Sequence, residues 1–357
     1  MDILSVVRLA AEKGASDVHI VAFSPPLLRV KGAMQPVAEM EPLTPDDIDQ
    51  AFNQITSEEQ RADFEQRLEL DFGYSVSDVG RIRCNVAKQR GTTSFVIRLL
   101  PSVVPAIDEL GLPEVCKELV LRPRGLVVVS GPTGSGKSTT LSAMINYLNS
   151  VENRRVVTIE DPIEFVYSNN KCVITQRELG GDTKSFAEAL RHVLRQDPDA
   201  ILVGEMRDLE TASAALTIAE TGHLVLTTGH APSAPQAIER IIDLFPPHER
   251  ATVQSRLASL LNGILCQALV PTVDGSGRIA AIEVLLASSA VKSNIREGKF
   301  YQLPNAMLTQ ARLGMVLLDH SLADLYHKGV ISRESVLAFC NDPDEVTRLI
   351  DGGVKLS

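Results

Sequence analysis

Hydrophobic and polar positions in the first hundred residues follow two different spacings, which together predict a mixed α/β module. Apolar residues at positions 3, 6, 7 and 10 fall on one face of a helix. A more polar stretch over residues 44–68 also has a helical pattern. Short strands are expected at residues 17–21, 27–30, 70–76, 80–86 and 93–99. We therefore expect residues 1–100 to form an N-terminal α/β domain.

Beyond residue 119 the pattern changes to short, continuous apolar runs separated by helical stretches. Such runs are typical of buried parallel strands, and their alternation with helices predicts a parallel, doubly wound sheet. The expected strands are residues 126–129, 155–159, 200–203 and 223–227. Residues 101–113 contain prolines and no strong period, so we expect a linker there. The predicted core then covers residues 114–285, and a small helical subdomain covers residues 286–357.

One motif lies between the first of these strands and a predicted helix over residues 139–148. Residues 131–138 read Gly-Pro-Thr-Gly-Ser-Gly-Lys-Ser, a complete phosphate-binding loop. Its glycines let backbone N–H groups curl toward a phosphate, and the following helix adds its positive N-terminus. Lys137 is expected to reach the β- and γ-phosphates of ATP, and the Ser138 hydroxyl to bind Mg²⁺. The predicted cofactor-binding residues are Gly131, Pro132, Thr133, Gly134, Ser135, Gly136, Lys137, Ser138 and Thr139.

Carboxylates follow two of the other predicted strands. Glu205 comes after the third strand, at the edge where parallel sheets bind ligands, and is expected to orient or deprotonate a water, directly or through Mg²⁺. Glu160, Asp161 and Glu164 come after the second strand, where positioning of metal or water is the functional interpretation. A solvated strand-end glutamate and an acidic turn bent by Pro162 are the structural alternatives.

Histidines and arginines give weaker signals. His223 and His230 bracket the fourth strand and are therefore not obvious ligands of one metal. A histidine beside a nucleotide can sense the γ-phosphate, whereas an isolated one more often has a structural role. Arginines crowd the end of the first module, where they could supply transition-state charge to a neighbouring subunit or lie on a solvated hairpin. These arginines are Arg81, Arg83, Arg90 and Arg98.

Composition narrows the class of protein further. The chain has 357 residues and a net charge of −10, which argues against a protein dedicated to nucleic acid. Its five cysteines lie far apart, which indicates neither a zinc site nor a disulfide framework. An apolar run of about 18 residues, as a membrane span needs, is missing, and the N-terminus does not resemble a secretion signal. We therefore expect a cytoplasmic protein that reaches a membrane only by docking onto a partner.

With these clusters in order, the chain resembles the secretion-superfamily ATPases, in particular the PilT-type retraction ATPases of type IV pili. GPTGSGKSTT is similar to the family's Walker A motif, TIEDPIEF to its aspartate box and PDAILVGEMRDLET to its Walker B motif. AETGHLVLTTGHAPSAPQAIERIID is similar to the histidine box. GASDVHI and ELDFGY resemble parts of the N-terminal PAS-like domain, and NIREGK and LGMVLLD resemble C-terminal helical motifs. The resemblance covers essentially the whole chain.

The resemblance implies a RecA-like ATPase core between a PAS-like domain and a helical subdomain, assembled into a homohexamer. It implies that ATP and Mg²⁺ are bound, and that the ring docks on an inner-membrane platform protein to power pilus retraction. Glu205 becomes the catalytic carboxylate, near water or Mg²⁺. The remaining implied catalytic residues are Glu160, Asp161, Glu164, His223, His230, Arg83 and Arg98.

Three departures from the family pattern concern how the second histidine is held and the direction of force. The histidine box usually continues His-Thr-x-Ser, and here it runs His230-Ala231-Pro232-Ser233. Asn294 replaces a leucine of the motif that supports retraction. A tetracysteine zinc insertion, found in assembly and secretion ATPases, is missing. An assembly or secretion ATPase and a non-catalytic accessory subunit of the retraction ring are the alternatives to a retraction motor, and a RecA-like nucleic-acid motor is disfavoured.

Overall fold

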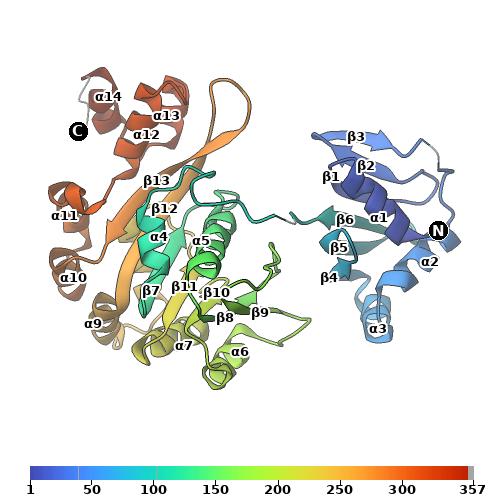
Figure 1. Ribbon diagram of the computed structural model, residues 1–357, viewed down its shortest axis with the longest axis horizontal. Helices are drawn as coiled ribbons and strands as arrows, with labels where there is room; N and C mark the ends of the chain where they lie inside the picture. Colours follow the sequence, from blue (N-terminus) through green and yellow to red (C-terminus); the bar gives the residue numbers. More distant parts are fainter. Residues whose placement is uncertain (39, 102, 353–357) are drawn as a thin grey trace. The chain divides into compact units, whose positions relative to one another are not determined.

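A computed structural model describes residues 1–38, 40–101 and 103–352 of the chain. The chain divides into two compact units, shown in Figure 1. One comprises residues 1–104 with 162–166, and the other comprises residues 105–161 with 167–357. Each unit has its own sheet and its own hydrophobic core, so each is described separately. The exact domain boundaries expected from the sequence stay predictions.

The first unit contains a six-stranded antiparallel sheet in the order β3-β2-β1-β6-β5-β4. Five of its strands match the predicted runs. The sixth, β3, was not predicted, because all four of its residues are exposed and give no apolar pattern. The strands are β1 (Ala15–Ile20), β2 (Leu27–Val30), β3 (Ala33–Pro36), β4 (Glu69–Val76), β5 (Gly80–Gln89) and β6 (Thr92–Leu99).

Three helices cover this sheet: α1 (Ile3–Glu12), α2 (Pro45–Ile55) and α3 (Glu58–Arg67). The predicted apolar face of α1 is confirmed, since positions 3, 6, 7 and 10 are all buried. The single polar helical stretch is instead two helices. A second N-terminus forms at Ser57, whose hydroxyl and the Gln60 side chain make reciprocal bonds with backbone N–H groups. This capping box stops one helix and begins the next.

The second unit is built on a seven-stranded sheet in the order β13-β12-β7-β11-β10-β8-β9. Neighbouring strands from β12 to β9 are parallel, and β13 pairs antiparallel with β12. The predicted α/β fold with a parallel sheet is thus confirmed, with one antiparallel edge strand. The strands are β7 (Gly125–Ser130), β8 (Arg155–Glu160), β9 (Val173–Glu178), β10 (Ala200–Val203), β11 (Leu224–Thr228), β12 (Leu261–Pro271) and β13 (Arg278–Leu286).

The hairpin of β12 and β13 was not predicted, and it changes the sheet because β12 lies directly beside β7. Most residues of β12 are buried, and its sequence is a mostly apolar run interrupted by Asn262 and Gln267. Such a run does not distinguish a buried strand from a buried helix by its period alone. The strand β9 was missed for the opposite reason, since most of its residues are only partly buried.

Helices cover both faces of this sheet, as a doubly wound fold requires (Figure 1). Helices α4 and α5 pack on one face, and α6 to α9 pack on the other. Ile107 and Leu112, from the expected linker, are buried in the first of these layers. The helices are α4 (Val115–Val120), α5 (Lys137–Val151), α6 (Phe186–Val193), α7 (Leu209–Glu220), α8 (Ala234–Asp243) and α9 (Arg250–Leu260), with the short 3-10 turn η1 (Leu194–Gln196).

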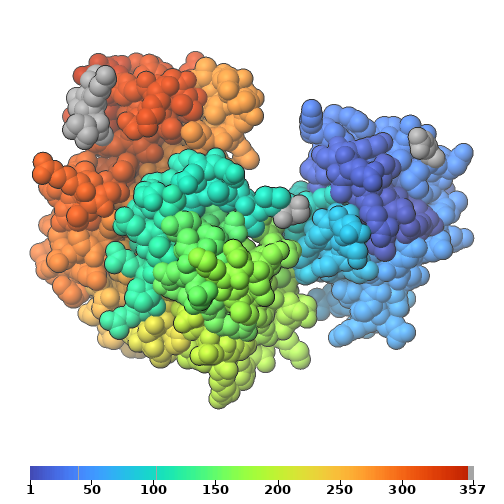
Figure 2. All heavy atoms as spheres, in the orientation of Figure 1, coloured from blue at the N-terminus to red at the C-terminus, as the bar shows by residue number. Residues whose placement is uncertain are grey.

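After β13, the described residues up to 352 contain helices and no further strand, as the sequence predicted. Several of these helices pack on the hairpin through a cluster that includes Val270, Ala281 and Leu322. Figure 2 shows their atoms in red against the orange atoms of the hairpin. The elements are α10 (Ser289–Arg296), η2 (Phe300–Gln302), α11 (Leu303–Thr309), η3 (Ala311–Leu313), α12 (Leu318–His327), α13 (Arg333–Phe339) and α14 (Pro343–Asp351). Among the described residues, none of the helices is long and apolar enough to cross a membrane.

Candidate nucleotide-binding and hydrolysis site

The phosphate-binding loop connects β7 to α5. All six residues of β7 are buried, so the strand fixes where the loop begins. Gly131, Gly134 and Gly136 have φ angles of 142°, 77° and 87°, which an L side chain rarely adopts. Gly136 is the N-cap residue of α5, and no side chain caps that helix from this position. The N-terminus of α5 therefore faces the loop without a cap of its own, as an anion-binding helix end requires.

A glutamine in the unpredicted strand β12 holds this loop. Gln267 is 3% exposed. Its Nε2 donates to the Ser135 carbonyl at 2.5 Å, and its Oε1 accepts from the Thr140 hydroxyl at 2.9 Å. A Cβ on Gly131 would lie 2.3 Å from the Gln267 carbonyl oxygen, so the close approach of loop and strand requires glycine. Sequence reasoning missed Gln267, although a lone amide within a long apolar run was a usable signal.

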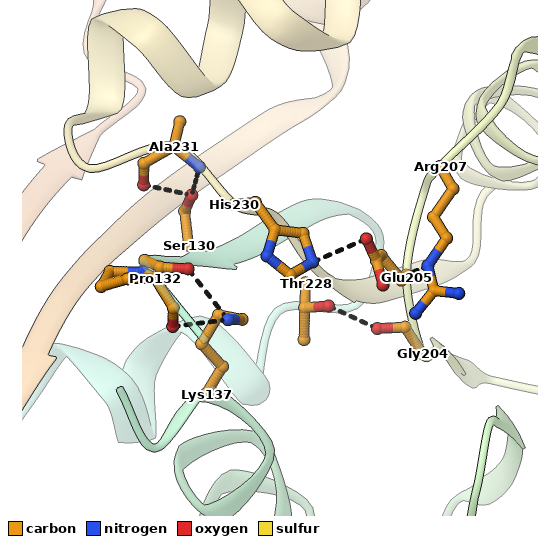
Figure 3. Close-up of polar contacts among 10 residues, drawn as sticks. Ser130, Pro132, Lys137, Gly204, Glu205, Arg207, Thr228, His230 and Ala231 are labelled. Carbon is orange, nitrogen blue, oxygen red and sulfur yellow. Dashed lines mark hydrogen bonds and ion pairs between the residues drawn. The ribbon is translucent and has the colours of Figure 1, made fainter. Parts of the chain in front are cut away.

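The loop fits a nucleotide polyphosphate. Lys137 is 9% exposed, and its Nζ donates to the carbonyls of Gly131 and Pro132 at 2.9 and 3.0 Å (Figure 3). The charge of Lys137 therefore lies over the curl of the loop, beside the first turn of α5. Ser135 Oγ is buried and has no hydrogen-bond partner among the residues that the structure describes. A cation, a polar atom without a partner and an uncapped helix N-terminus in one glycine-lined curl match a phosphate ligand.

Mg²⁺ fits this site only together with the phosphates. Ser138 and Thr139 lie in the first turn of α5, where a hydroxyl can bind a metal that bridges two phosphates. The described part of the chain contains no group of three or more His, Cys, Asp or Glu residues that could hold a metal. This is the usual situation for Mg²⁺, which is bound through few protein ligands and the substrate's own oxygens.

Glu205 lies just beyond the end of β10, and the side chains of His230 and Arg207 contact its carboxylate (Figure 3). His230 Nε2 is 2.6 Å from Oε1, and Arg207 Nε is 2.5 Å from Oε2. The Glu205 side chain is 16% exposed. The Thr228 hydroxyl donates to the Gly204 carbonyl at 2.6 Å and thereby fixes the backbone next to Glu205. The structure thus brings together two of the predicted site residues, Glu205 and His230; their roles in catalysis stay predictions.

A reciprocal pair of hydrogen bonds connects the histidine loop to the strand that carries the phosphate loop. Ser130 Oγ donates to the Ala231 carbonyl at 2.7 Å and accepts from the Ala231 N–H at 2.9 Å. Both contacts use only the main chain of Ala231. The departure from the family pattern at this position therefore leaves the connection intact, because no side chain beyond Cβ takes part.

An open cavity of about 480 Å³ lies beside Glu205, between the ends of β10 and β11 and the helix α8. Its polar lining comes from Glu205, Arg207, Thr228, His230 and Arg240, and its apolar wall includes residues of α8. Because β7, β11 and β10 are adjacent parallel strands, their carboxyl ends meet at one edge of the sheet. The phosphate loop, Glu205 and His230 all follow these ends, which is where doubly wound sheets bind ligands.

The acidic cluster is spread over the end of β8 and the turn that follows. Glu160 is 8% exposed, and it accepts from the Thr158 hydroxyl at 2.6 Å and from Gln176 Nε2 at 3.2 Å. Asp161 and Glu164 are exposed. Of the three carboxylates, only Glu160 is held within the sheet, next to the strand that leads to Glu205.

Four predicted site residues are not brought to this edge of the second unit's sheet, among them Glu164, which belongs to the first unit. His223 directly precedes β11, so it lies at the opposite end of the parallel strands, with Nδ1 3.0 Å from the Thr221 hydroxyl. Arg83 and Arg98 belong to the first unit, where they face each other across β5 and β6. Arg98 Nε donates to Asp17 Oδ1 at 2.9 Å.

The fold and site define a P-loop nucleotide-binding protein with a glutamate at the end of a neighbouring strand, the arrangement of ATPases. The model of the type II/IV secretion system protein family matches residues 2–313, and the chain belongs to this family. The resemblance predicted from the motifs is thus confirmed.

Three comparisons are more specific. The type IV pilus retraction ATPase PilT of Pseudomonas aeruginosa is 47% identical over 335 residues, which cover 94% of this chain and 97% of that protein. The type IV pilus ATPase PilU of the same organism is 41% identical, over 99% of this chain and 92% of PilU. A crystal structure of the pilus retraction motor PilT with bound ADP has a TM-score of 0.92 and 42% identity, covering 98% of this chain and 99% of that one.

Proposed function

We propose that this chain is the ATP-hydrolysing subunit of a hexameric motor that retracts a type IV pilus. The observation that carries the proposal is the juxtaposition, at one sheet edge, of the phosphate loop held by Gln267 and the Glu205–His230 pair. The high identity to PilT over nearly the whole of both chains supports the same activity.

Each residue has a proposed part in hydrolysis. Lys137 would exchange its loop carbonyls for the β- and γ-phosphates, and the Ser138 hydroxyl would hold Mg²⁺, which would supply charge stabilisation there when bound. Glu205 accepts a proton from, or orients, the attacking water. His230 holds one oxygen of Glu205 and Arg207 holds the other, so the two residues together fix the orientation of the carboxylate. Glu160, together with Asp161 and Glu164, would position water and metal. His223, the other residue of the histidine box, would couple the nucleotide to a neighbouring subunit.

The arginines of the first unit are proposed to act on a nucleotide in the ring. Arg83 and Arg98 are both exposed and directly opposite each other on antiparallel strands, where like charges repel. Arg98 is also paired with Asp17. A phosphate group is a natural partner for two adjacent guanidinium groups, and it would relieve their repulsion. We further propose that the ring is cytoplasmic and docks on an inner-membrane platform protein, with no nucleic acid involved.

A second candidate is a non-catalytic nucleotide-binding accessory subunit of the retraction ring. An assembly or secretion ATPase is the remaining alternative within the family. The retraction motor and the accessory subunit differ in one measurable property, since only the motor hydrolyses ATP as a purified protein without another subunit type.

The test compares Mg²⁺-dependent ATP hydrolysis by the wild type, by Glu205→Gln and by Glu210→Gln, with light scattering to measure the size of the assembly. Glu210 is a matched control because it is exposed and its carboxylate pairs with Arg191 on the surface of the neighbouring helix. We expect a hexamer, and a loss of roughly 100-fold or more in kcat for Glu205→Gln with ATP binding retained. Glu210→Gln should match the wild type. Tight ATP binding without turnover by the wild type would instead indicate an accessory subunit.

A further inference from the structure

A row of three buried polar side chains crosses the sheet of the second unit, beginning at the strand that carries the phosphate loop. Ser130 on β7 pairs with Cys266 on β12, and Cys266 pairs with Glu283 on β13. Residues that are direct cross-strand neighbours project to the same face of a sheet. All three are at most 2% exposed. Burial, together with the neighbouring Glu283, raises the pKa of the Cys266 thiol well above its usual value.

Glu283 ends this row, and its carboxylate caps two helices at once. Oε1 accepts from the N–H of Ala234, the first residue of α8, at 2.6 Å. Oε2 accepts from the N–H of Leu318, the first residue of α12, at 3.3 Å. Neither helix is capped by its own N-cap side chain, since Ser233 makes no such bond and Leu317 has no polar group. A buried carboxylate that replaces both caps stabilises each helix N-terminus through hydrogen bonds and charge.

The first of these helices forms a wall of the hydrolysis site. Ala237 and Ile241 of α8 line the cavity beside Glu205. The four residues before α8 include His230, which contacts Glu205, and Ala231, which is bonded to Ser130. The path from Glu283 to the Glu205 carboxylate thus runs through one helix N-terminus and one short loop. The second helix, α12, belongs to the C-terminal helices and does not contribute to the lining of that cavity.

We propose that Glu283 is a positioning residue for hydrolysis, which couples the placement of α12 to that of α8 and, through it, to the His230–Glu205 pair. A displacement of α12 changes the distance from Leu318 to the shared carboxylate, and Glu283 then moves relative to Ala234. The loop that carries His230 follows, because it ends at α8. The C-terminal helices and the hydrolysis site are therefore connected inside one subunit. The kinetic part of this inference rests on the proposed ATPase function.

The chain offers a matched control, a second buried carboxylate of the same region that caps a helix remote from the site. Asp319 is 5% exposed and accepts from the N–H groups of Asn341 and Asp342 at 2.7 and 2.9 Å, where α14 begins. Glu283→Gln and Asp319→Asn both replace a buried carboxyl group by an amide of similar shape and keep a side-chain oxygen that can accept. Only the first variant alters the contact to α8.

The experiment measures kcat and KM for ATP in both variants of the full chain. We expect Glu283→Gln to lower kcat about tenfold with KM within twofold of the wild type, because the defect is in placing His230 and not in holding the nucleotide. Asp319→Asn should leave both constants within twofold. Glu283→Asp keeps a carboxyl group, but the shorter side chain cannot reach the N–H groups of both Ala234 and Leu318, so this variant should also reduce kcat. It provides the test if Glu283→Gln does not fold. Equal kcat values for all variants and the wild type would overturn the proposal.

Hydrogen exchange provides a readout that does not depend on ATP hydrolysis. In Glu283→Gln, the amides of the non-proline residues in 230–237 should exchange at least about tenfold faster, while those at the start of α5 keep their protection. In Asp319→Asn, the faster exchange should be confined to the beginning of α14. If the wild type hydrolyses no ATP, the proposed function fails and the exchange data still decide this inference. Unchanged exchange at residues 230–237 in Glu283→Gln would contradict it.

Discussion

The contact between Gln267 and the phosphate loop allows a quantitative test of what holds the nucleotide site together. Replacing Gln267 by leucine keeps most of the side-chain volume in a strand that is otherwise apolar. It removes the bond to the Ser135 carbonyl and the bond from the Thr140 hydroxyl. Thr140 is 2% exposed, so water does not readily replace the lost partner. Each of the two buried groups left without its partner costs about 1–3 kcal/mol, which predicts a loss of about 2–6 kcal/mol in the free energy of unfolding of the second unit.

A double-mutant cycle separates this contact from general damage to the core. Thr140→Val deletes the hydroxyl that Gln267 accepts from, so in the double variant that group is no longer left unsatisfied. The two substitutions together should then cost about 1 kcal/mol less than the sum of the single costs. The affinity for ADP should also fall in Gln267→Leu, since the loop is no longer held in its curl.

The assay is chemical denaturation followed by far-UV circular dichroism, because the chain has no tryptophan to report on unfolding. The first unit has a separate core and serves as an internal reference, so its transition should not move. If the free energy of unfolding of the second unit in Gln267→Leu lies within about 0.5 kcal/mol of the wild type, the reasoning is refuted, because substitutions of exposed surface residues have effects of that size. Strict additivity in the cycle would show that the hydrogen bond between Thr140 and Gln267 carries no energy of its own.

Two further predictions concern the glycine of the loop and the acid stability of the first unit. Gly131→Ala should weaken ADP binding more than tenfold in a titration, because its Cβ would lie 2.3 Å from the Gln267 carbonyl oxygen; Gly277→Ala, with open space around it, should bind as the wild type does. Burial alone would raise the pKa of Asp17, but hydrogen bonds from Ser16 and Arg98 outweigh it and lower the pKa below 3.8. A lowered carboxyl pKa stabilises the fold above the unfolded-state value, and this stabilisation is lost as the pH falls through the folded-state value. Arg98→Gln should therefore flatten the loss of stability of the first unit below about pH 4 in thermal melts, and an unchanged pH profile would contradict this explanation.

The site residues that directly follow a predicted strand could be placed from the sequence. The loop with Lys137 and Ser138 follows its strand directly, and Glu205 and His230 follow theirs, so the parallel sheet brings them to one edge. What could not be predicted is the pairing of β12 with β7, because a long apolar run does not specify its partner or its direction. Gln267 and Glu283 act through that pairing, and so both escaped sequence reasoning. The histidine box also illustrates the limit, since a seven-residue spacing across a strand places His223 and His230 at opposite ends of it.

The position of β12 beside the phosphate loop also sets an order of events while the chain is being made. Gln267 comes 132 residues after Ser135 and 127 after Thr140. At about 5–20 residues per second, a nascent chain displays the complete loop sequence for roughly 7–26 s before the strand that holds it exists. Contacts between such distant residues also form slowly, because a long loop must close first. Nucleotide therefore cannot guide the folding of this core from its beginning; the sheet has to be completed by its late hairpin before the loop becomes a binding site.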